Sequence, residues 1–242
     1  MEIISIEGIV ISSLKYGENS KILNILTKDK GIIGVISKGA LKEKSKLRSV
    51  SDNFTYAIFH LYYKENKMST LISADVINYF LNIRTDIEKL GVLNYLTELT
   101  RDVYKSSSSS DIYDIFISAI LKIEEGFDPK IISNIVEIKY LDFLGIGLYL
   151  DGCVECGSTS VVSLSHAKGG YICYKHRKDE PLYDASFLKL IKAYYYIDIS
   201  KISELNLKNK TVNEIDNFLD IYYKDYTGLY LKSKNFFKNI KK

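Results

Sequence analysis

The sequence lacks the features of a membrane or secreted protein. It contains no run of about 18 apolar residues, the length that suggests a transmembrane helix. Its opening residues, Met1-Glu-Ile-Ile4, lack the basic start and apolar stretch of a signal peptide. Its three cysteines cannot all pair with one another, and disulfides are rare in a reducing compartment. We therefore expect a cytoplasmic protein without a membrane segment, whose cysteines bind metal or stay free.

Signatures of several common enzyme classes are also missing. The stretch Gly34-Val-Ile-Ser-Lys-Gly39 is followed by Ala40-Leu41 rather than Lys-Ser/Thr, so it is not a phosphate-binding P-loop. The sequence has no G-x-S-x-G nucleophile elbow and no H-E-x-x-H pair. No histidine begins the H-x-E element that nucleobase deaminases need. We predict no catalytic residues and a protein that is not an enzyme.

Tryptophan is absent, whereas tyrosine occurs 20 times. With so many tyrosines, no single one stands out as functional. Tyr56, Phe59, Tyr62 and Tyr63 could stack on unpaired nucleobases. We expect most of these four side chains to belong to the hydrophobic core instead.

What the sequence does contain is an ordinary globular composition, with 46% hydrophobic and 26% charged residues. The net charge of +3 is small, but the cations are clustered. Residues 38–48, called the basic segment below, have a single acid, Glu43, and the cations Lys38, Lys42, Lys44, Lys46 and Arg48. A second group of lysines, with no acid, lies between Tyr226 and Lys242.

The first third of the chain is rich in Ile, Val, Tyr and Phe in runs of strand length. Turn-forming or charged residues separate the runs. Five such strands fit a small barrel of the OB type, and we assign residues 1–80 to this domain. The expected strands are Ile3–Ser12, Lys21–Leu26, Ile32–Ser37, Phe54–Tyr63 and Ser69–Ile77.

The remainder, residues 81–242, shows apolar residues at helical spacing and predicts an α-helical domain. Asp128-Pro129 is a strong helix start, Gly145 a helix stop, and Thr211-Val-Asn-Glu214 a possible capping box. The overall class is therefore α+β. The expected helices run from about Arg84 to Val103, from Ser110 or Asp111 to Glu125, from Pro129 to Leu144, and over Ser186–Ile197 and Val212–Tyr226.

A cysteine-rich segment, residues 151–179, interrupts the helical pattern. It contains Cys153-Val-Glu-Cys156 and Cys173-Tyr-Lys-His176, a C-x2-C-x16-C-x2-H arrangement. Thiolate and imidazole are good zinc ligands, and the two-residue gaps let each pair approach one ion. Four protein ligands leave no open position for water, so we predict a structural Zn²⁺.

His176 is the least certain of the four predicted ligands. His166 and Asp179 are alternatives for the fourth position. The third histidine, His60, is expected within a strand.

The order of several short motifs resembles the RecO family of bacterial recombination mediators. In the first domain these are Gly8-Ile-Val, Tyr16-Gly-Glu18, Leu26-Thr-Lys-Asp-Lys-Gly31, Lys38-Gly-Ala40 and Ser45-Lys-Leu-Arg48. Later ones are Tyr95-Leu-Thr-Glu-Leu99, Glu137-Ile-Lys-Tyr-Leu141, Asp151-Gly-Cys-Val-Glu-Cys-Gly157 and Gly169-Gly-Tyr-Ile-Cys173. Many zinc-containing members end in a second C-x-x-C, whereas this chain has His176 in the last position.

The resemblance implies a protein that binds single- and double-stranded DNA and anneals complementary strands. It also implies that the protein acts at the nucleoid, where it works with RecR and single-stranded-DNA-binding protein to help RecA to load. On this interpretation the five cations Lys38 to Arg48 contact phosphates. Two other interpretations compete: a zinc-ribbon scaffold that binds only proteins, and a zinc-dependent nucleic-acid hydrolase.

Overall fold

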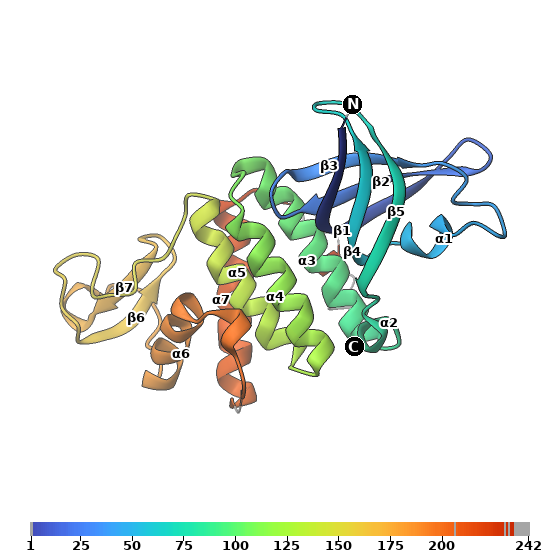
Figure 1. Ribbon diagram of the computed structural model, residues 1–242. Helices are drawn as coiled ribbons and strands as arrows, with labels where there is room; N and C mark the ends of the chain where they lie inside the picture. Colours follow the sequence, from blue (N-terminus) through green and yellow to red (C-terminus); the bar gives the residue numbers. More distant parts are fainter. Residues whose placement is uncertain (1, 206, 230, 232, 235–242) are drawn as a thin grey trace. The chain divides into compact units, whose positions relative to one another are not determined.

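The computed structural model describes residues 2–205, 207–229, 231, 233 and 234 (Figure 1). The chain divides into two compact units. Met1–Thr85 and Ser108–Asp114 form the first, and Asp86–Ser107 and Ile115–Lys242 form the second. The first is built mainly of strands and the second mainly of helices, which confirms the predicted α+β class.

The strands of the first unit close into a barrel in the order β1-β2-β3-β5-β4. They are β1 (Glu2–Tyr16), β2 (Ser20–Thr27), β3 (Gly31–Ser37), β4 (Tyr56–Tyr63) and β5 (Ser69–Asn78). All neighbours are antiparallel except β3 and β5, whose short parallel pairing sets Val35 opposite Ser69 and Ile36 opposite Thr70. Closure removes exposed strand edges, and it confirms the predicted five-stranded barrel.

The interior of the barrel is filled by alternate residues of its strands. Along β4, Ala57, Phe59 and Leu61 are completely buried, whereas Ile58 and Tyr62 are exposed. Side chains of a strand point alternately to its two faces, so this pattern defines an apolar interior and a mixed outer surface.

β1 is longer than predicted, because it ends at Tyr16 rather than Ser12. A β-bulge between Val10 and Ser12 inserts one extra residue in its pairing with β2. The bulge breaks the simple alternation in the sequence, and the strand continues beyond it.

The second unit is organised around α5 (Pro129–Phe143), which contacts α3 (Ile87–Ser106), α6 (Ala185–Tyr196) and α7 (Asn209–Tyr226). Most residues of α5 are buried, as expected for a helix with neighbours on several sides. Most of α4 (Asp111–Glu125) also belongs to this unit, as do short 3-10 turns at Tyr174–His176 and Ile199–Lys201, whereas α1 (Leu47–Val50) and α2 (Leu81–Arg84) belong to the first unit. In the described part of the chain, no helix has the length and apolar character to cross a membrane.

The helix-start prediction at Asp128 is confirmed. Its carboxylate accepts hydrogen bonds from the backbone N–H groups of Lys130 at 2.8 Å and Ile131 at 3.2 Å. The capping box predicted at Thr211 is wrong: α7 begins two residues earlier, at Asn209, and Thr211 is buried inside the helix. Thr211 and Val212 are buried in the second unit, and this burial favours a helical conformation for the turn that contains them.

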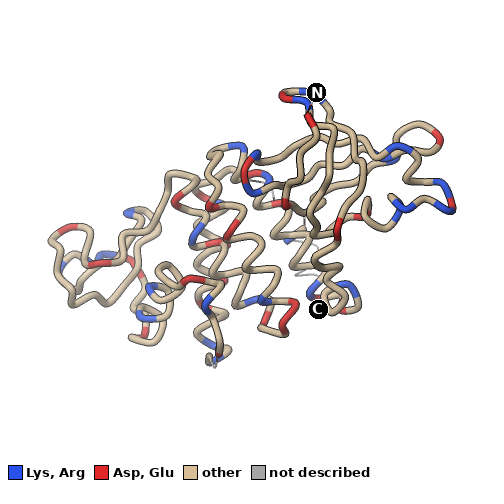
Figure 2. The backbone as a smooth tube through the Cα atoms, in the orientation of Figure 1, with Lys and Arg blue, Asp and Glu red and all other residues tan. Residues whose placement is uncertain are grey.

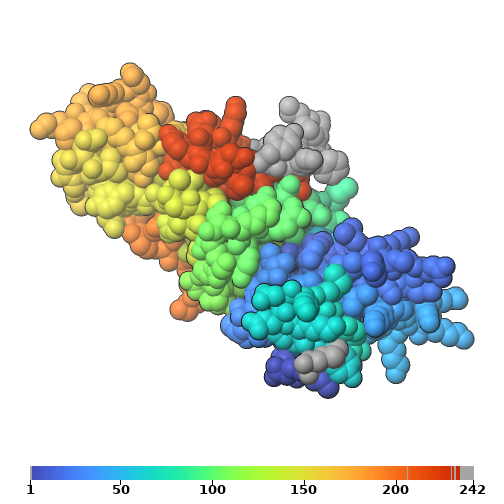
Figure 3. Space-filling model, turned by 90° about the horizontal axis from the view of Figure 1, so that it is seen from above, coloured from blue at the N-terminus to red at the C-terminus, as the bar shows by residue number. Residues whose placement is uncertain are grey.

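The cysteine-rich segment lies between α5 and α6, as a hairpin of β6 (Val161–Ser165) and β7 (Gly170–Cys173). The His166 ring in its turn stacks on Phe218 of α7 with 4.2 Å between ring centroids. Figure 3 shows this segment, coloured yellow to orange, beside the red residues of α7. The segment is therefore packed against the helical unit.

A buried charge cluster holds residues 233 and 234 on the second unit. The Lys234 ammonium lies 2.7 Å from the carboxylate of Glu137, whose side chain is 1% exposed, and 2.9 Å from that of Asp220. The backbone N–H of Ser233 donates to Glu98 at 2.9 Å. Of the lysine-containing stretch Tyr226–Lys242, residues 230, 232 and 235–242 lie outside the described part of the chain.

Replacing Lys234 with Met would leave the buried Glu137 carboxylate without its cation. We expect the free energy of unfolding to fall by about 3–5 kcal/mol, measured by chemical denaturation. Lys105→Met is the control, because Lys105 pairs with Asp102 at the surface and should contribute less than about 1 kcal/mol. Glu137→Gln in the Lys234→Met background should recover part of the loss. Equal stability of Lys234→Met and wild type would contradict this assignment.

Candidate metal centre and nucleic-acid interface

The first cysteine pair sits in a tight turn. The backbone N–H groups of Cys156 and Gly157 donate to the Cys153 carbonyl at 3.3 and 2.7 Å. Gly157 has a φ of +72°, which a glycine adopts without strain. A Cβ on Gly152 would lie 2.6 Å from the Gly157 carbonyl oxygen, so the turn also needs glycine there. The Cys-x-x-Cys-Gly sequence thus folds both thiols toward one point.

The second pair comes from the end of the hairpin. Cys173 is the last residue of β7, and His176 ends the 3-10 turn that follows. The Arg177 N–H donates to the Cys173 carbonyl at 3.0 Å and holds the turn closed. On the other side, the Val154 N–H donates to the Tyr171 carbonyl at 2.9 Å, which joins the first turn to β7.

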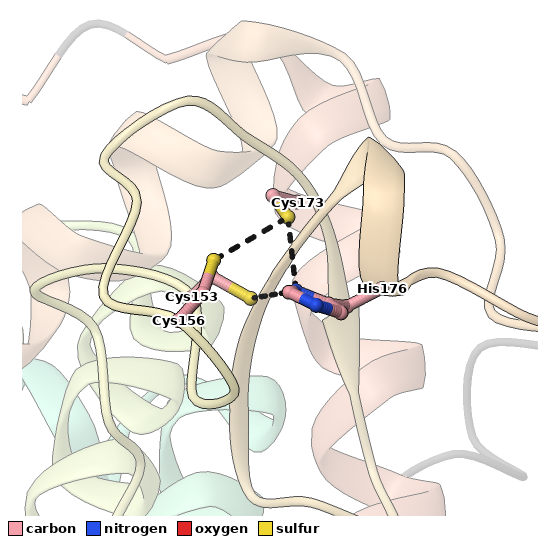
Figure 4. A group of neighbouring side chains, drawn as sticks. All are labelled: Cys153, Cys156, Cys173 and His176. Atoms are coloured by element: carbon pink, nitrogen blue, oxygen red, sulfur yellow. Dashed lines mark hydrogen bonds between the residues drawn. The ribbon is translucent and has the colours of Figure 1, made fainter.

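The four side chains converge, with all ligand atoms within 4.8 Å of one another (Figure 4). Cys156 Sγ lies 3.8 Å from Cys173 Sγ, and His176 Nδ1 lies 3.7 Å from Cys153 Sγ and 3.4 Å from Cys173 Sγ. Zn–S bonds of about 2.3 Å at tetrahedral angles would set neighbouring sulfurs roughly 3.8 Å apart. The spacing fits one tetrahedral ion held by three sulfurs and Nδ1.

The surroundings of Cys153 favour its thiolate. Burial raises the pKa of Cys153, but backbone hydrogen bonds from Cys173 and Glu155 and the His176 ring outweigh it and lower the pKa to about 6. For Cys156, a backbone hydrogen bond from Ser158 lowers the pKa, but burial and the neighbouring thiols raise it above its ordinary value. Thiolates are the form that binds metal, so the turn prepares Cys153 as a donor.

The two alternative fourth ligands lie outside this group. His166 packs on Phe218, and its Nε2 is 3.3 Å from the Phe218 carbonyl oxygen. Burial lowers the pKa of His166 below its ordinary value. Asp179 is exposed and does not belong to the converging group. The geometry favours His176, and the ligand assignment itself stays a prediction.

The basic segment joins β3 to β4. Ala40 is completely buried, and Leu47 and Val50 of α1 pack against the barrel core. The Lys42 N–H donates to the Gly39 carbonyl at 3.1 Å, one of several turns along the segment. The fold therefore anchors the segment at both ends.

The predicted phosphate contacts all project from this anchored segment into solvent. Figure 2 shows the cations along the loop that precedes α1. The five exposed side chains are Lys38, Lys42, Lys44, Lys46 and Arg48.

The aromatic residues considered for base stacking divide into two groups. Tyr56 and Phe59 are 7% and 0% exposed, so both side chains are buried. Tyr62 is exposed on the outside of β4, and Tyr63 is half-buried with the Lys30 ammonium 4.6 Å from its ring centroid. The structure does not gather the four into one surface.

Comparisons with known proteins agree over the whole chain. Residues 1–80 match the family "Recombination protein O N terminal", and residues 84–235 match "Recombination protein O C terminal". The protein is 33% identical to DNA repair protein RecO of Bacillus subtilis, over 95% of this chain and 92% of the relative. It is 32% identical to the proteins of that name in Halalkalibacterium halodurans (95% and 92%) and Listeria monocytogenes (98% and 94%).

The two histidines of the segment should differ in metal binding. We expect His176→Ala to weaken binding of a divalent metal by more than about 10-fold, because even substitutions outside the ligand shell cause such losses. His166→Ala should keep the wild-type affinity, since its ring contacts Phe218. Competition with a chromophoric chelator measures the metal affinity of both variants. The reverse ranking would assign the fourth ligand to His166.

Proposed function

The chain belongs to the recombination protein O (RecO) family, and from this premise we propose that it is a DNA-binding recombination mediator. Membership makes it a RecO-family DNA repair protein. The observation that carries DNA binding is the exposed basic segment anchored to a closed barrel, a fold that often binds oligonucleotides.

In the proposed complex, the five cations of the basic segment neutralise phosphates of the backbone. Each contact releases a counterion, so the binding affinity falls as the salt concentration rises and depends little on base sequence. The barrel within residues 1–80 would be the nucleic-acid-binding domain, and residues 81–242 the helical domain that carries the metal segment.

The finer activity is carried over from the family resemblance. We propose that the protein anneals complementary single strands and, with RecR, helps RecA to load on DNA coated by single-stranded-DNA-binding protein. It would bind both single- and double-stranded DNA, and would act in the cytoplasm at the nucleoid.

We propose Zn²⁺ as the ion of the Cys153, Cys156, Cys173 and His176 group, in a structural role. Three thiolates and one imidazole are a preferred zinc donor set, and four ligands complete a tetrahedron without water. A hydrolase would need an open position for water, so this donor set favours a protein without catalytic activity. The segment has a small apolar cluster, in which Cys153 and Cys173 are themselves members. A bound metal ion would supply stability that these few apolar contacts do not provide.

Removal of four positive charges from the basic segment tests the proposed phosphate contacts. Replacing Lys42, Lys44, Lys46 and Arg48 with Ala should weaken binding to every oligonucleotide sequence and lower the salt slope by up to roughly 3, because each single-strand contact contributes about 0.7. Fluorescence anisotropy over a salt series measures this. The control removes four exposed lysines of the second unit that lie outside the cysteine-rich segment: Lys105, Lys201, Lys208 and Lys224.

Unchanged affinity and slope in the first variant would reject the segment as the contact surface. Annealing of a labelled strand to its complement, with and without single-stranded-DNA-binding protein, tests the mediator activity. If the wild type binds no DNA even at low salt, the protein-only scaffold replaces this proposal.

Removing the metal tests the structural role. Chelation, or Cys153→Ser, should loosen residues 151–179 and lower the melting temperature of the helical unit by about 5–10 °C. The barrel should keep its own stability. Differential scanning calorimetry and limited proteolysis follow the two units separately, and identical melting and cleavage with and without metal would contradict a structural ion.

A further inference from the structure

Three hydrogen-bonded side chains cross the outer surface of β1, β4 and β5. The Ser5 hydroxyl oxygen lies 2.8 Å from His60 Nδ1, and His60 Nε2 lies 2.8 Å from a carboxylate oxygen of Asp75. Ser5 belongs to β1, His60 to β4 and Asp75 to β5. This group, called the serine relay below, belongs neither to the basic segment nor to the cysteine-rich segment.

The pairing of the strands holds the serine relay in place. Ser5 is directly opposite His60 in the pairing of β1 with β4. Asp75 is opposite Ile58 in the pairing of β4 with β5, and Ile58 points to the same face of β4 as His60. Side chains at direct and diagonal positions of neighbouring strands are close enough to interact. The relay is therefore part of the closed barrel wall rather than of a loop.

The hydrogen bonds determine which nitrogen of the neutral His60 ring carries the proton. An ionised carboxylate only accepts hydrogen bonds, so Nε2 donates to Asp75. The lone pair then lies on Nδ1, which accepts the hydroxyl proton of Ser5. A base that touches a hydroxyl and is oriented by a third group is the arrangement that activates serine nucleophiles. Relative to the serine-protease triad, the two ring nitrogens exchange roles.

The Ser5 hydroxyl is accessible and has apolar neighbours. Ser5 is exposed, and the His60 side chain is 29% exposed. Ile3 pairs with Tyr62 on the same outer face, and these side chains are 64% and 41% exposed. Covering this pair with an apolar or aromatic group of a small molecule removes apolar surface from water, which is favourable.

We propose that Ser5 is a modification site, whose hydroxyl reacts with activated carboxylic esters and retains the acyl group. Ser5 Oγ attacks the carbonyl carbon of the ester, and its proton passes to His60 Nδ1. The bond to the leaving oxygen breaks, and that oxygen keeps the electron pair. His60 then releases the proton to the leaving group or to water. The products are an ester at Ser5 and a free alcohol or phenol, so no further reactant is needed.

The surroundings of the relay favour one acylation over repeated hydrolysis. Turnover by serine hydrolases depends on N–H donors that point at the developing oxyanion. β4 lies between β1 and β5, so its backbone N–H groups near His60 bond to these neighbours. Because β4 supplies no such donor, attack by water on the acylated serine is not assisted. We expect about one acyl group per chain.

4-Nitrophenyl acetate tests the reaction, since its phenolate product is coloured. The wild type should release about one equivalent of phenolate in a rapid phase, and tandem mass spectrometry should locate the acetyl group on Ser5. Ser5→Ala should abolish the rapid phase and keep the wild-type melting temperature, because Ser5 is exposed. Ser73→Ala is the matched control: Ser73 is exposed opposite His60 on β5, but both ring nitrogens already bond to Ser5 and Asp75.

Variants of the other two relay residues test how Ser5 is activated. His60→Gln should slow the rapid phase about 10²-fold, the lower end of the range for general-base assistance. Asp75 is a positioning residue that acts through His60. Asp75→Asn should also slow the phase, because an amide can donate to Nε2 and so favours the tautomer with the proton on Nδ1. Asp75→Glu should recover part of the rate, a rescue that a merely structural role would not give.

Two results would overturn the inference. One is acetylation confined to lysines and the N-terminal amine. The other is acetylation of Ser5 at the wild-type rate in His60→Gln, which would show that the hydroxyl is not activated by the relay. The test is independent of the proposed DNA binding, because the phosphate contacts and the metal ligands are other residues.

Discussion

Closure of the barrel is the constraint on which the first unit depends. The parallel contact of β3 with β5 is only two residue pairs long, yet it completes the ring of strands. Once the ring is closed, Phe59, Leu61 and their neighbours must fill the interior, and the alternate residues must face outward. Closure also determines where the β3–β4 connection lies, because α1 packs against the core that closure creates.

The cysteine-rich segment, residues 151–179, differs from the barrel because its apolar cluster is small. Its two strands pair over a few residues, and its small cluster includes two of the cysteines. Cross-linking the two turns through one ion would compensate for this shortage. Packing of His166 on Phe218 connects the segment to α7, so order in the segment and order in the helical unit are physically linked.

The proposed DNA site depends on a long-range electrostatic force. The cations of the basic segment would act over about a Debye length and would attract any nucleic acid toward the barrel. The Ser20–Gly39 and Asn19–Leu41 hydrogen bonds connect the β1–β2 turn to the basic segment and fix its start on the barrel.

Much of the fold follows from local signals along the chain. Strand-length apolar runs located all five barrel strands, and the Asp128-Pro129 start located α5, because these signals are local. The cysteine spacing named the four side chains that converge, since a two-residue gap already brings each pair together. Local signals failed at Thr211, where packing extended the helix past the expected cap.

The remaining features depend on contacts between residues that are far apart in the sequence. The tertiary structure extended β1 through the bulge to Tyr16 and set His166 against Phe218 rather than among the thiols. It also paired Lys234 with Glu137 across 97 residues of sequence. These facts depend on which residues meet after the chain folds, and no window of sequence contains both partners.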